Sequence, residues 1–228
     1  MINSHRSPHI VRRTRVTVPP ASEPVTLADV KAQARVTTSA DDAFLTALIT
    51  VCRKTLEEQL GMAFMSTTIV QTMDAFPGYG QPWWAGTRTA HANVLQAYPD
   101  TIELMHRPIS AVSSVKTYDI SDTSTTVDPT VYQTDLSDPM VPSRIMLRRG
   151  ESWPTELRDM NAVEVTYIAG FGAAVDVPGD IKQAIMQMVT FLYDSRGGCD
   201  CSSGSAAACM LPCGAEILVS QYRMLEFM

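Results

Sequence analysis

The spacing of apolar residues changes twice along this 228-residue chain, and the two changes predict its architecture. From residue 24 to residue 61, apolar residues recur every three to four positions, which is typical of helices. From about residue 65 to residue 169, short β-branched runs are separated by Pro, Gly, Asp and Ser turns, which is typical of strands. After Gly170 the helical spacing returns. The pattern predicts an α+β fold in which N- and C-terminal helices form a helical core, with an antiparallel β domain inserted between them.

Two helices are predicted in the first helical region. Residues 26–29 have the spacing of a capping box, with the Thr26 hydroxyl placed to accept an N–H of the first turn and Asp29 favoured by the helix dipole. Residues 39–42 repeat the signal and open a longer helix, which Gly61 is well placed to end. Its apolar stripe consists of Phe44, Leu45, Leu48, Ile49, Cys52, Leu56 and Leu60. The opposite face is expected to be solvated and carries Arg53, Lys54, Glu57 and Glu58.

The rest of the chain is divided into strands, loops and two further helices. Strands are predicted at residues 66–73, 101–105, 112–118, 131–134, 144–147 and 162–168. Loops are expected at residues 76–100 and 197–214, and helices at residues 178–196 and 215–226. The predicted helical domain therefore consists of residues 24–64 and 174–228, and residues 65–173 form the inserted β domain.

Positive charge is concentrated at the N-terminus. Before the first acid, Glu23, the chain carries four arginines, Arg6, Arg12, Arg13 and Arg15, and the remainder carries 14 of the 18 basic residues and all 24 acidic ones. A body this acidic is a poor general binder of nucleic acid, because affinity for DNA depends on Lys and Arg that neutralise phosphates. Residues 1–23 are predicted to be a disordered, solvated basic arm. An arm that becomes ordered against an acidic neighbouring subunit is the alternative.

No membrane association is predicted. Hydrophobic residues make up 45% of the sequence and charged residues 18%, which is an ordinary globular balance. No stretch approaches the roughly 20 apolar residues that span a bilayer, and the polar N-terminus lacks the apolar core of a signal peptide. The chain is therefore expected to be made as a soluble protein of the cytoplasm.

The cysteines offer the strongest signal for a metal site. Four thiols lie within fifteen residues: Cys199, Cys201, Cys209 and Cys213. Four thiols can bind zinc or an iron–sulfur cluster, but a one-residue gap strains two ligands on one tetrahedral metal. Free thiols in a mobile loop are favoured, with a disulfide as a second possibility and a metal as a third. The remaining cysteine, Cys52, lies on an apolar helix stripe and is expected in the core.

Aromatic residues suggest contacts rather than chemistry. Trp83 and Trp84 lie in the long glycine-rich loop, where they could stack on carbohydrate or bases, or anchor an interface with a neighbouring subunit. The interface is favoured. Trp153, in a Ser-Trp-Pro turn, is expected to pack beneath the sheet.

Catalytic motifs are missing from the sequence. It contains no Gly-x-Ser-x-Gly elbow, no P-loop and no Gly-x-Gly-x-x-Gly, and its four histidines are scattered in the arm, a loop and a strand end. Neither enzyme activity nor a cofactor is therefore expected.

An ordered set of short segments resembles the phage head–tail connector family, in its longer members from tailed phages and gene transfer agents. The resemblance extends from Pro24 to Arg223. It rests on residues 24–31, 34–36, 41–61, 74–77, 82–84, 102–104, 107–115, 152–154, 161–165, 169–172, 177–178, 181–185 and 221–223. No single segment is diagnostic, and the specificity lies in their order. The cysteines between the last two helices depart from the family pattern, in which a short plain loop is usual.

The resemblance implies a structural virion protein at the head–tail junction, assembled in the host cytoplasm. It implies a ring, commonly of twelve subunits, between the portal protein and a tail-side connector, stopper or tail terminator protein, with DNA passing through the lumen. The terminal helices would contact the portal, with Tyr222 and Arg223 as candidate contact residues, and the β domain would face the tail or outward. The rival hypothesis is a small metal-binding regulatory or nucleic-acid-binding module built around residues 199–213. A helix-turn-helix made of residues 26–60 is disfavoured, because its second helix lacks a basic base-reading face.

Overall fold

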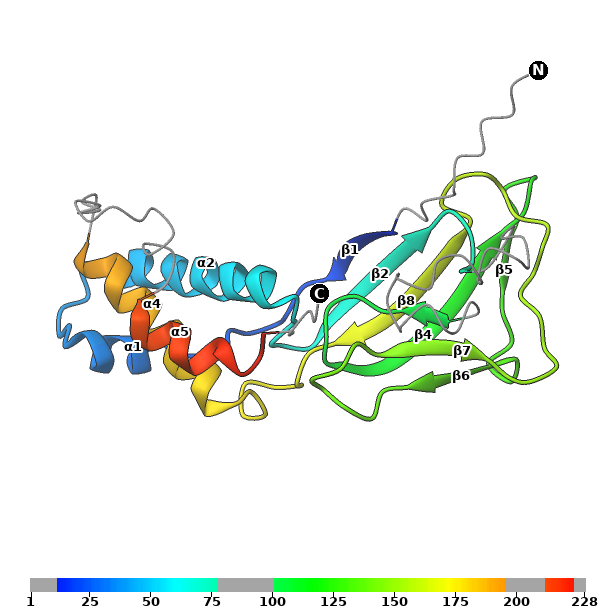
Figure 1. Cartoon of the computed structure of the whole chain (residues 1–228). Coiled ribbons are helices and arrows are strands. Elements are labelled where there is room, and N and C mark those ends of the chain that lie inside the picture. Colours follow the sequence, from blue (N-terminus) through cyan, green and yellow to red (C-terminus); the bar gives the residue numbers. More distant parts are fainter. Residues whose placement is uncertain (1–11, 78–100, 196–211, 224–228) are drawn as a thin grey trace, which may run out of the picture. The chain divides into compact units, whose positions relative to one another are not determined.

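The computed structural model describes residues 12–77, 101–195 and 212–223, and it confirms the α+β class (Figure 1). The helices are α1 (Leu27–Ala34), α2 (Asp42–Leu60), α4 (Gly179–Asp194) and α5 (Cys213–Ser220). The strands are β1 (Arg12–Val18), β2 (Thr67–Met73), β3 (Thr101–Glu103), β4 (Ile109–Tyr118), β5 (Ser124–Thr126), β6 (Tyr132–Asp135), β7 (Arg144–Leu147) and β8 (Val163–Ala169). No helix in the described ranges is long and apolar enough to cross a bilayer.

The chain forms two compact units. The β unit takes in Met1–Val18 and Thr68–Ile168, and the helical unit takes in Pro19–Thr67 and Ala169–Met228. The chain passes between the units at residues 18/19, 67/68 and 168/169, whereas the predicted helical domain was bounded at residues 23/24, 64/65 and 173/174.

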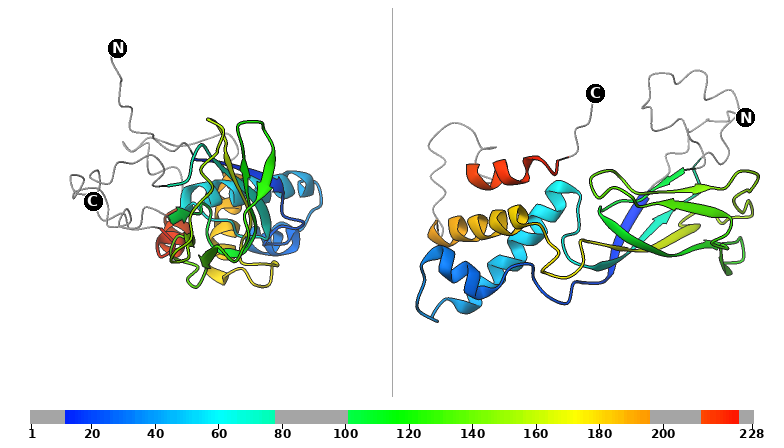
Figure 2. Two further views of the ribbon diagram at one scale, coloured as in Figure 1. Left: turned by 90° about the vertical axis from the view of Figure 1, so that its right-hand side faces the viewer. Right: turned by 90° about the horizontal axis from the view of Figure 1, so that it is seen from below.

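Helix α4 is the centre of the helical unit, and α1, α2 and α5 all pack against it (Figure 2). The core is formed by Leu45, Ile49, Cys52 and Leu56 of α2 with Ile181, Ala184, Ile185, Met188 and Val189 of α4. Burial raises the pKa of the Cys52 thiol to about 12, so this cysteine is a neutral core residue, as predicted. Phe44 was assigned to the core stripe but is 43% exposed.

Three helix ends were predicted from local sequence signals, and the structure confirms two of them. The capping box of α1 is present, since Asp29 N donates to Thr26 Oγ1 at 3.2 Å and Thr26 N donates to Asp29 Oδ2 at 3.1 Å. Gly61 ends α2 in the left-handed region, with φ at 60°. The cap at Ser39 was wrong, because the N-cap of α2 is Asp41, whose carboxylate accepts a bond from the Tyr193 hydroxyl at 2.8 Å instead.

The face of α2 that was expected to be solvated contains a buried ion network. Arg53 is only 5% exposed and lies between two carboxylates, 2.6 Å from Glu23 and 2.5 Å from Glu57. Glu57 also accepts the backbone N–H of Phe64 at 2.8 Å. The prediction failed because Glu23, which lies thirty residues earlier in the sequence, covers the guanidinium. The network ties the start of the helical unit and the turn after α2 to the middle of α2.

The β unit contains a five-stranded sheet in the order β1-β2-β8-β4-β5 and a three-stranded sheet in the order β3-β7-β6. The β1–β2, β4–β5, β3–β7 and β6–β7 pairs are antiparallel. Alternate residues of β8 are buried, as its sequence pattern predicts. The buried Gln71 of β2 donates from Nε2 to the Glu103 carbonyl at 2.9 Å and accepts Met105 N at 3.0 Å. These bonds join the large sheet to β3.

Trp153 packs inside the β unit, as predicted. It is 7% exposed and stacks on Phe76, with ring centroids 4.3 Å apart and planes 5° from parallel. Tyr132 lies on the same aromatic cluster, 6.3 Å from Trp153.

The prediction of a disordered arm was wrong for residues 12–18, which form strand β1. This strand pairs with β2 from Arg12↔Met73 to Val16↔Ile69. Its three arginines concealed an alternating pattern of β-branched residues, and its partner lies more than fifty residues away. Side chains hold it as well, because Arg12 Nη1 is 3.2 Å from Glu103 Oε2 and Thr14 Oγ1 is 3.1 Å from His106 Nε2. Strand β5 was also missed.

His106 should make the β unit less stable in mild acid. Burial lowers the pKa of His106, so the neutral ring is favoured in the folded chain. Below the ordinary value of 6.5 the unfolded chain takes up a proton that the folded chain resists, so the free energy of unfolding falls as the pH drops below about 6.5. We expect a shallower fall between pH 7 and 5 for His106→Asn, because Asn tolerates the positive φ of 63° at this position. Urea unfolding over this range measures both slopes, and equal slopes would contradict this role of His106.

Candidate interaction site

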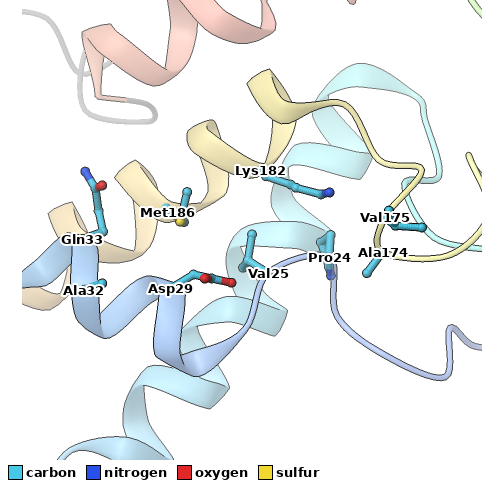
Figure 3. A pocket seen from close by; sticks show the side chains of 9 residues that line it. All are labelled: Pro24, Val25, Asp29, Ala32, Gln33, Ala174, Val175, Lys182 and Met186. Carbon is cyan, nitrogen blue, oxygen red and sulfur yellow. The ribbon is translucent and has the colours of Figure 1, made fainter.

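The helical unit has a groove of about 690 Å³ between α1 and α4 (Figure 3). Most of its lining is apolar: Pro24, Val25, Ala32, Ala174, Val175 and Met186, with Gln33. Two charges complete it, Asp29 from α1 and Lys182 from α4. The hydrogen bonds from Thr26 lower the pKa of Asp29, so its carboxylate stays ionised beside Lys182. The groove can therefore hold an apolar side chain next to a pair of opposite charges.

A second apolar surface lies where α2 meets α4. A pocket of about 170 Å³ is lined by Val51, Cys52, Thr55, Met188, Phe191, Leu192 and Pro212. Four apolar side chains of these two helices are more than one third exposed: Phe44, Val51, Phe191 and Leu192. Phe44 and Tyr193 lie with their rings 6.4 Å apart. Helices that pack only against one another would not leave so many large apolar groups in water, so this surface has the character of an interface.

One side of helix α5 is buried against the rest of the helical unit, and the other side is exposed. Ala215, Val219 and Tyr222 are buried, and Gly214 lies against the side chain of Gln187 of α4, whose Oε1 would be 2.7 Å from a Cβ at this glycine. On the other side Ile217 is 73% exposed. A residue placed there can contact a partner without disturbing the attachment of the helix.

The structure gives the two candidate contact residues of this helical end different positions. Tyr222 is buried, and its pKa is raised by burial and then by the neighbouring Asp180, so it attaches the end of α5 to the start of α4. Gln221 makes the same attachment, donating to Asp180 at 2.7 Å. Arg223 is exposed and lies 3.2 Å from Glu216. Arg223 is thus open to a partner, and Tyr222 is not.

The other candidate residues lie outside the described ranges. These are Trp83, Trp84, Cys199, Cys201 and Cys209, together with the side chain of Cys213, the first residue of α5. In the described part of the chain, no three His, Cys, Asp or Glu side chains are grouped to hold a metal. The exposed Ile217 was missed, although its signal was present: residues 215 and 219 form the apolar stripe of α5, residue 222 continues it in the turn after the helix, and residue 217 falls off it.

A family model described as "Phage gp6-like head-tail connector protein" matches residues 24–140, just over half of the chain. The chain belongs to this connector family. The connector is therefore a structural protein of the virion head–tail junction, in a family whose role is structural and not enzymatic. The match begins at Pro24, includes α1, α2 and the five strands β2 to β6, and ends within the β6–β7 connection.

Solved structures with the same fold come from gene transfer agent (GTA) particles. A chain from the virion of a native GTA particle is 19% identical, with a TM-score of 0.69, and the match covers 94% of the connector and 97% of that chain. A chain from the neck of an empty particle, computed with C6 symmetry, has a TM-score of 0.70 at 19% identity, covering 95% and 97%. One from the neck of a native particle, computed with C12 symmetry, has a TM-score of 0.62 at 20% identity, covering 96% and 97%. A comparison with curated proteins finds no match.

Proposed function

We propose that the connector is a head-to-tail adaptor whose copies form a closed ring between the portal protein and a tail-side connector, stopper or tail terminator protein. The observation that carries this proposal is the shared fold along nearly the whole chain with chains of GTA particles, two of them from particle necks. The C12 and C6 symmetries of those necks are both compatible with twelve copies around one axis. A ring of identical copies needs complementary surfaces on each subunit, and the helical unit offers exposed apolar ones.

DNA passes through the lumen of this ring without sequence-specific binding. The net charge of the chain is −6, and the part that follows the N-terminal arginines carries 24 acidic residues against 14 basic ones. A surface of this sign repels the phosphate backbone, so DNA can slide without adhering.

Helix α5 is the element through which the helical unit contacts the portal, with Ile217 and Arg223 exposed for that purpose. Truncation of residues 215–228 is a poor test, because it would remove three buried residues and uncover α4. A single substitution on the bare side of α5 leaves the attachment intact.

Ile217→Asp should fold normally and fail to join heads to tails. A charge at the centre of an apolar contact commonly costs about 2 kcal/mol or more, which corresponds to a fall of at least about tenfold in joined particles. The matched control is Met160→Asp, the same change at a 64% exposed methionine of the β unit. Complementation of particles that lack the chain, scored by electron microscopy, measures joining. Equal complementation by the two variants would remove α5 from the portal contact.

A further inference from the structure

The two edges of the five-stranded sheet are open in the described part of the chain. Strand β1 has β2 as its only ladder partner, and β5 has only β4. No residue of β1 is buried, and all three residues of β5 are exposed. The outer side of each strand therefore presents backbone N–H and C=O groups that another strand can pair with.

These edges carry opposite charge. Strand β1 contains three arginines and no acid, whereas β5 itself is uncharged and the segments on either side of it carry Asp119, Asp122 and Asp128. Arg13 and Arg15 are exposed and, two residues apart, point to the same side of the strand. On the other edge, Asp122 is 78% exposed in the turn before β5, where it pairs with Arg158, and hydrogen bonds from Thr130 lower the pKa of Asp128 just after β5. Two β1 edges therefore repel each other, and so do two β5 edges, whereas a β1 edge attracts a β5 edge.

Apolar residues are exposed beside both edges. Val16 and Val18 of β1 are 54% and 57% exposed, and Ile120, in the turn between β4 and β5, is 81% exposed. A free edge strand that only had to avoid association would place charge at such positions. Edge-to-edge contact would bring these side chains beside the neighbouring copy.

We propose that β1 of one copy pairs with β5 of the next copy, so that the five-stranded sheets join into one continuous belt. The inference rests on the proposed ring, and it specifies how the copies contact each other. Because two different edges of the same subunit meet, the contact is head-to-tail, which is the kind of contact that closes a ring of many copies. Repulsion between two β1 edges, or between two β5 edges, disfavours the symmetric dimer.

Cysteine pairs across the two edges test the arrangement directly. We would place Arg15→Cys with Thr125→Cys, and separately Val16→Cys with Thr125→Cys, in full-length chains whose four cysteines at residues 199–213 are serine. Joined particles carrying either pair should give, after mild oxidation, a ladder of dimers, trimers and larger multimers on a non-reducing gel. Each chain with only one of the two introduced cysteines should stay monomeric, because the remaining native cysteine, Cys52, is buried. Dimers from the β1 cysteine alone, or no ladder from either pair in particles that contain the chain, would overturn the inference.

Charge reversal gives a second test with a matched control. Arg13→Glu with Arg15→Glu should reduce incorporation of the chain into particles by about tenfold or more, because like charges would then face each other across the contact. Arg148→Glu with Arg149→Glu makes the same charge change at an exposed turn of the same unit and should leave incorporation unchanged. Equal behaviour of the two double variants would contradict the pairing.

These measurements separate the inference from the proposed function. An immunoblot of purified particles first shows whether the wild-type chain is present at the junction. Its absence there would contradict the proposed adaptor function. Its presence without cross-linking between β1 and β5 would contradict only the edge-to-edge contact.

Discussion

Arg53→Met is expected to destabilise the helical unit by about 3–5 kcal/mol, the cost of removing one partner from a buried ion pair. The substitution keeps the length of the side chain but leaves Glu23 and Glu57 without their shared cation. Burial already raises the pKa of Glu57, against the effect of the Phe64 N–H and Arg53. Without Arg53 that pKa rises further, so part of the loss should be recovered as the pH is lowered and Glu57 takes up a proton.

Urea unfolding followed by circular dichroism at the helical band measures this loss. Lys54→Met is the matched control, because Lys54 is the next residue of the same helix and is exposed. We expect it to change the free energy of unfolding by no more than about 0.5 kcal/mol. Adding Glu57→Gln to Arg53→Met should restore part of the stability, since the amide oxygen can still accept the Phe64 N–H. A loss of less than about 1 kcal/mol for Arg53→Met would show that the network is solvated after all.

Gly170→Ala is the second substitution with a large expected effect. Gly170 directly follows β8 at φ +116°, and a Cβ there would lie 2.2 Å from the Met65 carbonyl oxygen. Backbone bonds hold the two segments together on either side of this contact, from Phe171 N to Phe64 O at 3.2 Å and from Ser66 N to Gly172 O at 2.9 Å. Since the obstacle is backbone, neither segment can give way without losing these bonds. We expect a loss of about 3 kcal/mol or more.

Gly150→Ala separates the two causes of that loss, which are the conformational cost of a side chain at positive φ and the steric clash with the Met65 backbone. Gly150 also has a positive φ, +92°, but a Cβ there would meet nothing within 4 Å. This control should therefore show only the conformational cost, about 1 kcal/mol. Thermal or urea unfolding of both variants gives the comparison. If the two substitutions lower the free energy of unfolding equally, the close approach of the segments at residues 65 and 170 does not contribute to stability.

Sequence reasoning succeeded where the determining interactions are local. The capping box at Thr26, the stop at Gly61 and the alternation in β8 each depend on residues within a few positions, and the structure contains all three. It failed where the environment of a residue depends on another residue far away in the sequence. Arg53 is classed as exposed by charge alone, yet Glu23 buries it, and β1 depends on a partner more than fifty residues away.

The interaction site shows the same division. The apolar stripe of α5 can be predicted from its sequence. The stripe alone does not show whether an aromatic residue near it packs inside the helical unit or faces a partner. Tyr222 was a candidate contact because it lies in the last segment that resembles the connector family, and only the position of Asp180 on α4 shows that it is attached internally. The roles of Trp83, Trp84 and the cysteines of residues 199–213 stay predictions, because these side chains lie outside the described ranges. The metal content of the purified full-length chain tests the alternative of a metal-binding module.

The most direct test of the adaptor role is electron microscopy of particles assembled without this chain. We predict heads and tails that are each complete but unjoined, and recovery of joined particles when the wild-type chain is supplied. In the joined particles, a ring of density should lie between portal and tail and fit the α+β fold described above. Heads that retain their DNA and join tails in the absence of the chain would contradict the account.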